Sequence, residues 1–178
     1  DYSIWSVGAF LALLGADRVV AMIPRASDPE RLLKDARAKA LLDVHNDGIW
    51  QWTPVLEAPP AHPLLSQLRD GGDAGIVLFT SGSTGAPKAA LQSLERFLHK
   101  FTRRGKSYRT LAFLLFDHIA GLDTLFYTLA GGGVVIVTRS RSPVDVCRLI
   151  EKSRVEVLAA SPRFLRLLCL AGEATSTD

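Results

Sequence analysis

The sequence predicts an α/β protein in which helices pack on a largely parallel sheet. From residue 74 onward, short apolar runs alternate with segments of helical periodicity, and the clearest strand is Ile76–Phe79. A continuous apolar run of this kind is typical of a strand that is covered on both faces. Strands that are separated by helices of about ten or more residues usually lie parallel in one sheet.

Each element follows from its own periodicity and boundary residues. Ile4, Phe10 and Leu14 mark one face of a helix, and Pro29 suits the first turn of another helix that Ser27 or Asp28 can cap. The expected helices are 4–14, 29–40, 91–104, 119–130, 144–152 and 162–170. The expected strands are 18–23, 76–79, 110–116, 134–137 and 155–159, with a further strand around residues 50–52. A division of the chain is expected near 59–73, where prolines and glycines interrupt the pattern.

Composition limits the function classes. The chain has 178 residues, of which 48% are hydrophobic and 22% charged, as in globular proteins and unlike disordered ones. A net charge of +3 gives no argument for nucleic-acid binding. The longest apolar run, Val7–Ala16, is well below the roughly 20 residues that a membrane-spanning helix needs. Cys147 and Cys169 are expected to be free thiols in a reducing compartment, which indicates a cytoplasmic location.

A glycine- and hydroxyl-rich segment follows the Ile76–Phe79 strand and carries the chemistry. Its glycines allow backbone N–H groups to approach a ligand closely, and its hydroxyls and lysine can bind phosphate oxygens. A helix is expected soon afterwards, and its amino end would favour an anion. The residues expected to hold a polyphosphate are Thr80, Ser81, Gly82, Ser83, Thr84, Gly85 and Lys88.

This segment resembles the phosphate loop of the adenylate-forming superfamily, which includes acyl-CoA synthetases, luciferases and peptide-synthetase adenylation domains. The family's loop has hydroxyl residues around two glycines and ends in proline and lysine, and Thr80–Lys88 matches it throughout. Ala89 stands where the family usually has glycine, so the mobility of the loop is in question. Phe116-Asp117-His118 followed by Gly121 is similar to the aromatic-His-x-x-Gly segment of the family.

The resemblance implies a two-step activity. ATP and a carboxylic acid form an acyl-adenylate with release of pyrophosphate, and the acyl group then passes to coenzyme A or to the phosphopantetheine of a carrier protein. Lys88 would support catalysis by neutralising charge, and Phe116, His118 and Gly121 would border the acyl pocket. Mg²⁺ is implied by the ATP chemistry, but no residue can be assigned as its ligand. The acid is left open among fatty, aromatic and amino acids.

The resemblance also implies an incomplete enzyme. We find none of the family's later adenine, magnesium and ribose segments, and no small carboxy-terminal domain with its catalytic lysine. We therefore expect residues 1–178 to be part of the large amino-terminal AMP-binding domain and to be inactive in adenylation alone. The alternative is a non-catalytic module that keeps the phosphate loop and binds a nucleotide or a partner protein.

Other motifs have simpler interpretations. The alternative for His118 is a structural histidine that caps the following helix or is hydrogen-bonded in a core, but its place between Phe116 and Gly121 favours the pocket. Gly105-Lys106-Ser107 is not a kinase-type phosphate loop, because Lys100 stands where that motif needs glycine. The basic residues between Arg96 and Arg109 form a solvated helix face or, alternatively, attract the phosphates of ATP or coenzyme A.

Overall fold

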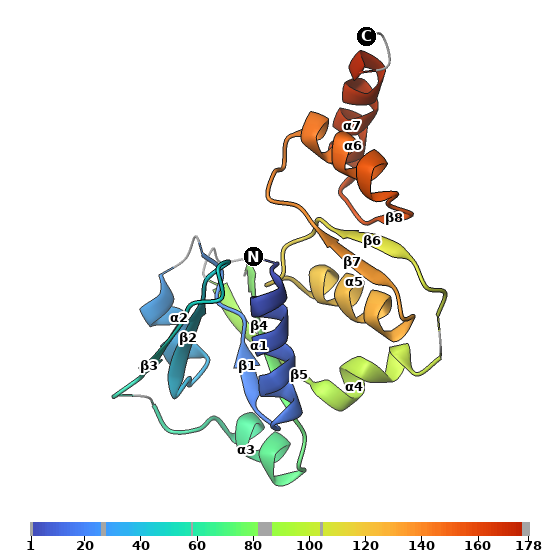
Figure 1. The fold of residues 1–178 in the computed structure, drawn as a ribbon. Helices are drawn as coiled ribbons and strands as arrows, with labels where there is room; N and C mark the ends of the chain where they lie inside the picture. The colour runs from blue at the N-terminus through green and yellow to red at the C-terminus, as the bar shows by residue number, and fades with distance from the viewer. Residues whose placement is uncertain (1, 26–27, 58, 82–86, 104, 176–178) are drawn as a thin grey trace. The chain divides into compact units, whose positions relative to one another are not determined.

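The computed structural model describes residues 2–25, 28–57, 59–81, 87–103 and 105–175 (Figure 1). These residues form two compact units. The first unit comprises Asp1–Lys100 together with Phe116–His118, and the second comprises Phe101–Leu115 and Ile119–Asp178. Helices and strands occur in both units, which confirms the α/β class. No helix in the described ranges is long and apolar enough to cross a membrane.

The first unit contains two small sheets with helices beside them (Figure 1). In chain order its elements are α1 (Ile4–Gly15), β1 (Val19–Ala21), α2 (Pro29–Asp35), β2 (Ala40–Val44), β3 (Trp50–Pro54), α3 (Pro63–Asp70), β4 (Gly75–Ser81), β5 (Pro87–Ser93) and α4 (Leu94–Leu98). One sheet has the order β1-β4-β5, with β1 parallel and β5 antiparallel to β4. The other is the antiparallel pair β2–β3. Residues 59–73 lie within this unit, and a division of the chain there stays a prediction.

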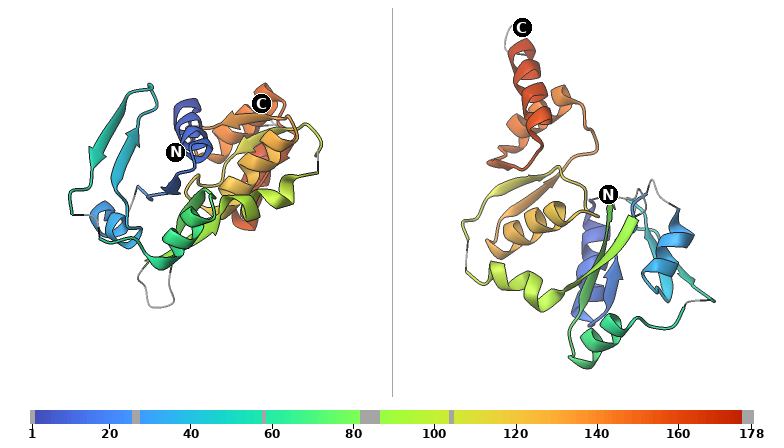
Figure 2. Two further views of the ribbon diagram at one scale, coloured as in Figure 1. Left: turned by 90° about the horizontal axis from the view of Figure 1, so that it is seen from below. Right: turned by 180° about the vertical axis from the view of Figure 1, so that it is seen from behind.

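The second unit contains a parallel sheet with helices following its strands (Figure 2). After the short 3₁₀ turn His99–Phe101, its elements are β6 (Arg109–Ala112), α5 (Ile119–Ala130), β7 (Val134–Val137), α6 (Pro143–Ser153), β8 (Val157–Leu158) and α7 (Pro162–Thr175). β6 lies between β7 and β8 and is parallel to both. Phe113 stacks on Phe164 of α7 with ring centroids 4.1 Å apart, and Leu111 and Val146 complete this core.

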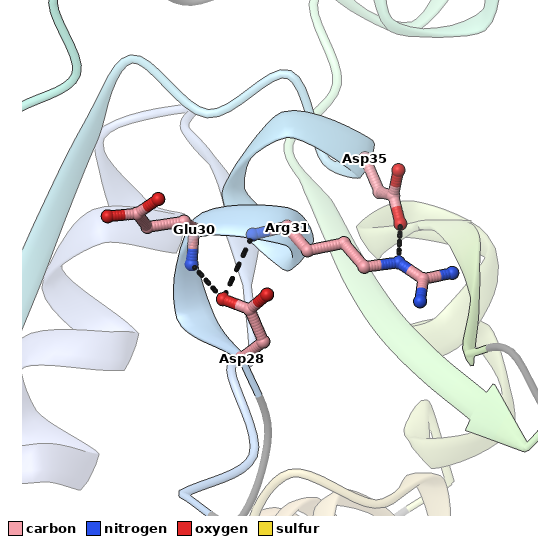
Figure 3. Close-up of polar contacts among 4 residues, drawn as sticks. All are labelled: Asp28, Glu30, Arg31 and Asp35. Carbon is pink, nitrogen blue, oxygen red and sulfur yellow. Dashed lines mark hydrogen bonds and ion pairs between the residues drawn. The ribbon is translucent and has the colours of Figure 1, made fainter.

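The helix α2 shows how local signals in the sequence act. Asp28 Oδ1 accepts hydrogen bonds from the backbone N–H of Glu30 at 3.1 Å and of Arg31 at 3.5 Å, as Figure 3 shows. This is the expected cap, with Pro29 in the first turn. Arg31 and Asp35 form an exposed ion pair at 3.8 Å, which contributes little to stability.

Two expectations about the fold are corrected, one for the helix α2 and one for the sheet. The helix that begins at Pro29 ends at Asp35 and not near residue 40, because Arg37 takes a left-handed conformation with φ of 54°. The N–H of Ala38 then bonds the carbonyl of Leu33, which closes the helix end and directs the chain into β2. The sheet is parallel only in part: β5 and the β2–β3 pair are antiparallel, and the strands form three sheets within the described residues.

All three tryptophans of the chain lie at the surface of the first unit. Trp5 is 52% exposed, Trp50 65% and Trp52 55%. Trp50 and Trp52 are two residues apart on β3 and therefore share one face of the β2–β3 pair. The Trp5 ring lies against Gly48 in the turn between these strands, where an added Cβ would stand 2.8 Å from the ring. The strand expected around residues 50–52 is thereby confirmed, as β3.

Candidate functional site

The strand β4 carries the first residue of the candidate phosphate loop from a buried core to the surface. Ile76, Val77, Leu78 and Phe79 are all buried, which confirms the expectation of a strand covered on both faces. Val77 and Phe79 pack in a cluster with Leu32 of α2. Thr80 is the next residue and is exposed. The change from apolar to hydroxyl residues in the sequence therefore marks the point where the strand reaches solvent.

The strand β5 places Lys88 directly opposite Thr80. The antiparallel register pairs these two residues, and the Thr80 hydroxyl donates to the Lys88 carbonyl oxygen at 3.4 Å. Directly paired residues of an antiparallel ladder project from the same face, with Cβ atoms about 5 Å apart. Lys88 is exposed. The register thus sets the side chains of Thr80 and Lys88 on the same face at the base of the loop, where the exposed ammonium group of Lys88 can contact an anion.

The remaining loop residues lie largely outside this description. Gly82, Ser83, Thr84 and Gly85 are not among the described residues, and Ser81 is described only as the backbone partner of Pro87. The role of these five residues in holding phosphates therefore stays a prediction.

The segment after the loop is a strand, which corrects the expected helix. Residues 87–93 form β5, and α4 begins only at Leu94, where the Ser93 hydroxyl accepts a hydrogen bond from the N–H of Arg96. The amino end of a helix is therefore not supplied directly after Lys88. Any phosphate at this loop would depend on backbone N–H groups, hydroxyls and Lys88. Ala89 lies within β5 opposite Phe79, in a regular strand position that any residue with a Cβ can adopt.

The candidate acyl-pocket residues differ in exposure. Phe116 is only 6% exposed, and its ring contacts Tyr2 at 4.7 Å and Phe10 at 5.3 Å between centroids. Burial raises the pKa of the Tyr2 phenol, so this side chain stays neutral throughout the physiological range. His118 is exposed. Phe116 and His118 belong to the first unit, whereas Gly121 is buried in α5 of the second. Their grouping into one pocket stays a prediction.

The aromatic contacts of Phe116 were not predicted from the sequence. Tyr2 and Phe10 lie at the beginning of the chain and Phe116 lies far along it, so periodicity within one segment cannot pair them. The only signal that could have identified Phe10 is its place on the apolar face of α1, where it is buried. Nothing in the sequence singles out Tyr2.

Two residues of the other motifs make hydrogen bonds to backbone carbonyls in the described part of the chain. The Ser107 hydroxyl donates to the Gly132 carbonyl at 2.9 Å and so joins two backbone segments. Arg109 donates from Nε to the Ser153 carbonyl at 2.7 Å. Arg96, Lys100, Arg103 and Lys106 are exposed, whereas Arg104 lies outside the described residues. Within the described ranges, no three His, Cys, Asp or Glu side chains gather as metal ligands would.

Comparison with known proteins identifies the family. The sequence profile of the AMP-binding enzyme family matches residues 2–178, so the chain belongs to this family.

Three relatives show the range of the family that this chain is similar to. Phenyloxazoline synthase MbtB of Mycolicibacterium paratuberculosis is 33% identical over 186 aligned residues, which cover 95% of this chain and 15% of the synthase. The nonribosomal peptide synthetase atnA of Emericella nidulans is 34% identical over 107 residues, 56% of this chain and 2% of the synthetase. YdaB of Bacillus subtilis, provisionally named an acyl–CoA ligase, is 24% identical over 177 residues, 88% of this chain and 35% of YdaB. The chain therefore spans between 2% and 35% of the length of these relatives.

Proposed function

We propose that this chain is part of an ATP-dependent acid–thiol ligase. The complete enzyme would convert a carboxylic acid into an acyl-adenylate, release pyrophosphate and pass the acyl group to a thiol. Membership of the AMP-binding enzyme family supports this proposal at the level of adenylation. The observation that carries it is the pairing of Thr80 with Lys88 at the base of the hydroxyl-rich segment.

In this proposal the segment Thr80–Lys88 holds the phosphates of ATP. Ser81, Ser83 and Thr84 would donate hydroxyl hydrogen bonds to phosphate oxygens, and Thr80 would do so by exchanging its hydrogen bond to the Lys88 carbonyl for one to phosphate. Gly82 and Gly85 would let the backbone approach the phosphates. Lys88 would neutralise negative charge as pyrophosphate leaves. Mg²⁺ would shield the same charges. Its ligands would come from residues that are not identified in this chain.

The acyl group and its acceptor form the second part of the proposal. Phe116, His118 and Gly121 would border the acyl pocket. The acceptor would be coenzyme A or a carrier phosphopantetheine, and the similarity both to a nonribosomal peptide synthetase and to YdaB supports either. The complete protein would act in the cytoplasm, where ATP and reduced thiols are available.

The alternative is a binding module without catalysis. Such a module would keep the phosphate loop for a nucleotide or a partner protein and would lack acid activation. The two proposals differ in one measurable property, because only the ligase exchanges pyrophosphate into ATP when an acid is supplied.

The test is ATP–pyrophosphate exchange by the complete natural protein that carries this chain, over a panel of fatty, aromatic and amino acids. We expect acid-dependent exchange, which Lys88→Ala lowers by about 100-fold because one charged contact to the leaving phosphates is removed. The matched control is Lys152→Ala, which removes an exposed lysine of α6 and should leave exchange unchanged.

Each other outcome has a defined meaning. Full exchange by Lys88→Ala would refute the phosphate-loop assignment. No exchange with any acid, together with ATP binding that Lys88→Ala abolishes, would support the binding module. Acyl-AMP formation by residues 1–178 alone would refute our expectation that this part is inactive by itself.

A further inference from the structure

An aromatic cluster fixes the segment that carries His118 to the helix α1. Phe116 contacts Tyr2 with a tilt of 36° between the ring planes and Phe10 edge-on at 76°. Tyr2, Phe10 and Phe116 are each at most 9% exposed. Aromatic pairs in these geometries add roughly 0.5–1.5 kcal/mol each to the stabilisation from burial. Phe116 is therefore held by Phe10 of α1 and by Tyr2, which lies just before that helix.

The position of Tyr2 is itself fixed by the start of α1. Ser3 caps the helix by accepting a hydrogen bond from the Ser6 N–H at 3.0 Å, and its own N–H donates to the Ser6 hydroxyl at 2.9 Å. Such a capping box satisfies two backbone donors and sets the direction in which the chain enters the helix. Tyr2 immediately precedes this box. Its ring and that of Phe10 thus form a preorganised surface for Phe116.

Covalent geometry transmits this constraint to His118. Two residues of extended chain span about 7 Å at most, so the backbone of His118 cannot lie farther than this from that of Phe116. His118 is exposed in a bend, and α5 begins at the next residue. Because His118 is exposed in this bend, the buried ring two residues earlier and the start of α5 both constrain where its imidazole begins.

We propose that Tyr2 and Phe10 are positioning residues that act through Phe116 to place His118 beside the acyl group. This inference rests on the proposed function and extends it to two residues outside the loop and the pocket segment. Loss of the Phe10 ring would leave the phosphate loop intact, because the loop is built on β4 and β5. The acid site would instead lose the alignment of His118.

The test is the exchange reaction of the complete natural protein, with KM measured separately for the acid and for ATP. We expect Phe10→Ala to raise the acid KM about tenfold or more, since small misplacements of positioning groups cost up to about 100-fold, and to leave the ATP KM unchanged. Phe10→Leu, which fills more of the space, should fold well and give a smaller shift in the same direction. The matched control is Leu14→Ala, because Leu14 is 4% exposed and lies one turn farther along the same helix.

A double-variant cycle separates positioning from general destabilisation. In a His118→Ala background, Phe10→Ala should raise the acid KM no further, because the group through which it acts is gone. An equal effect of Leu14→Ala, or a full effect of Phe10→Ala without His118, overturns the positioning role while the ligase stands. Absence of exchange in the unsubstituted protein overturns the proposed function and this inference with it.

Discussion

Thr110 on β6 offers a sharp test of the packing in the second unit. Its side chain is 1% exposed, and its hydroxyl has no hydrogen-bond partner among the residues that the structure describes. A buried hydroxyl without a partner costs about 1–3 kcal/mol, judged from substitutions in other proteins. Thr110→Val replaces this hydroxyl by a methyl group of similar size. We therefore expect the free energy of unfolding to rise by about 1–2 kcal/mol.

The matched control is the same substitution at Thr128 of α5. Thr128 is 2% exposed, but its hydroxyl donates to the Thr124 carbonyl at 2.8 Å. Thr128→Val removes a hydrogen bond that is made, so we expect a loss of about 0.5–1.5 kcal/mol. The two substitutions are alike in volume and burial and should differ in sign.

Urea unfolding followed by far-UV circular dichroism measures both effects. The Thr110→Val midpoint should move to higher urea with an unchanged slope, which indicates a change in stability alone. A midpoint that falls by as much as that of Thr128→Val would show that the Thr110 hydroxyl has a partner, and the reasoning from burial would be refuted.

Four further substitutions test other features by the same unfolding assay. Gly131→Ala should destabilise the protein by about 1–3 kcal/mol, because the new Cβ would stand 2.5 Å from the Lys106 carbonyl oxygen. Gly8→Ala, on the open face of α1, should instead stabilise it by about 0.5–1 kcal/mol. Equal effects of the two substitutions would contradict this reasoning. Asp73→Ala should cost about 1–2 kcal/mol, since its carboxylate accepts hydrogen bonds at the start of α4, and an unchanged midpoint would exclude that role. Ser3→Ala should cost about 1 kcal/mol as the capping box is lost, and a shift below about 0.3 kcal/mol would argue against the cap.

Elements with a single clear signal could be predicted from the sequence. α5 and β7 begin and end where their periodicity does, at Ile119–Ala130 and Val134–Val137. The core strand Ile76–Phe79 was recognisable because its apolar run is bounded by a glycine and by hydroxyl residues. In these cases local pattern and tertiary packing point to the same structure.

The helix predicted directly after the loop was wrong, because the spacing of its leucines fits a helix as well as a strand followed by a helix. Leu91 precedes Leu94 by three residues, as on a helix, but Leu91 is a strand residue that pairs with Val77 and packs against the core cluster of this unit. Pairing with β4 outweighs the weak local preference, as tertiary context often does. Ser93 was the available signal, because a serine that caps a helix at Leu94 cannot lie inside one that begins earlier.

The loop residues of the candidate site could be proposed from the sequence, whereas the strand pairing and aromatic contacts around them could not. The hydroxyls, glycines and Lys88 are contiguous in sequence, so their chemistry can be recognised without a structure. The register that sets Thr80 opposite Lys88 depends on the pairing of two strands. The contact of Phe116 with Tyr2 and Phe10 depends on the fold bringing distant segments together.

The exposure of the tryptophans affects the fluorescence of the protein. Trp5, Trp50 and Trp52 are each more than half exposed in the first unit, so their indole emission should already resemble that of indole in water while the protein is folded. Unfolding would then change the emission wavelength little, and acrylamide would quench the native protein efficiently. A blue shift of the emission would instead report that another molecule or segment covers the β2–β3 pair. The tryptophan fluorescence should therefore be a useful signal of association and a poor signal of folding.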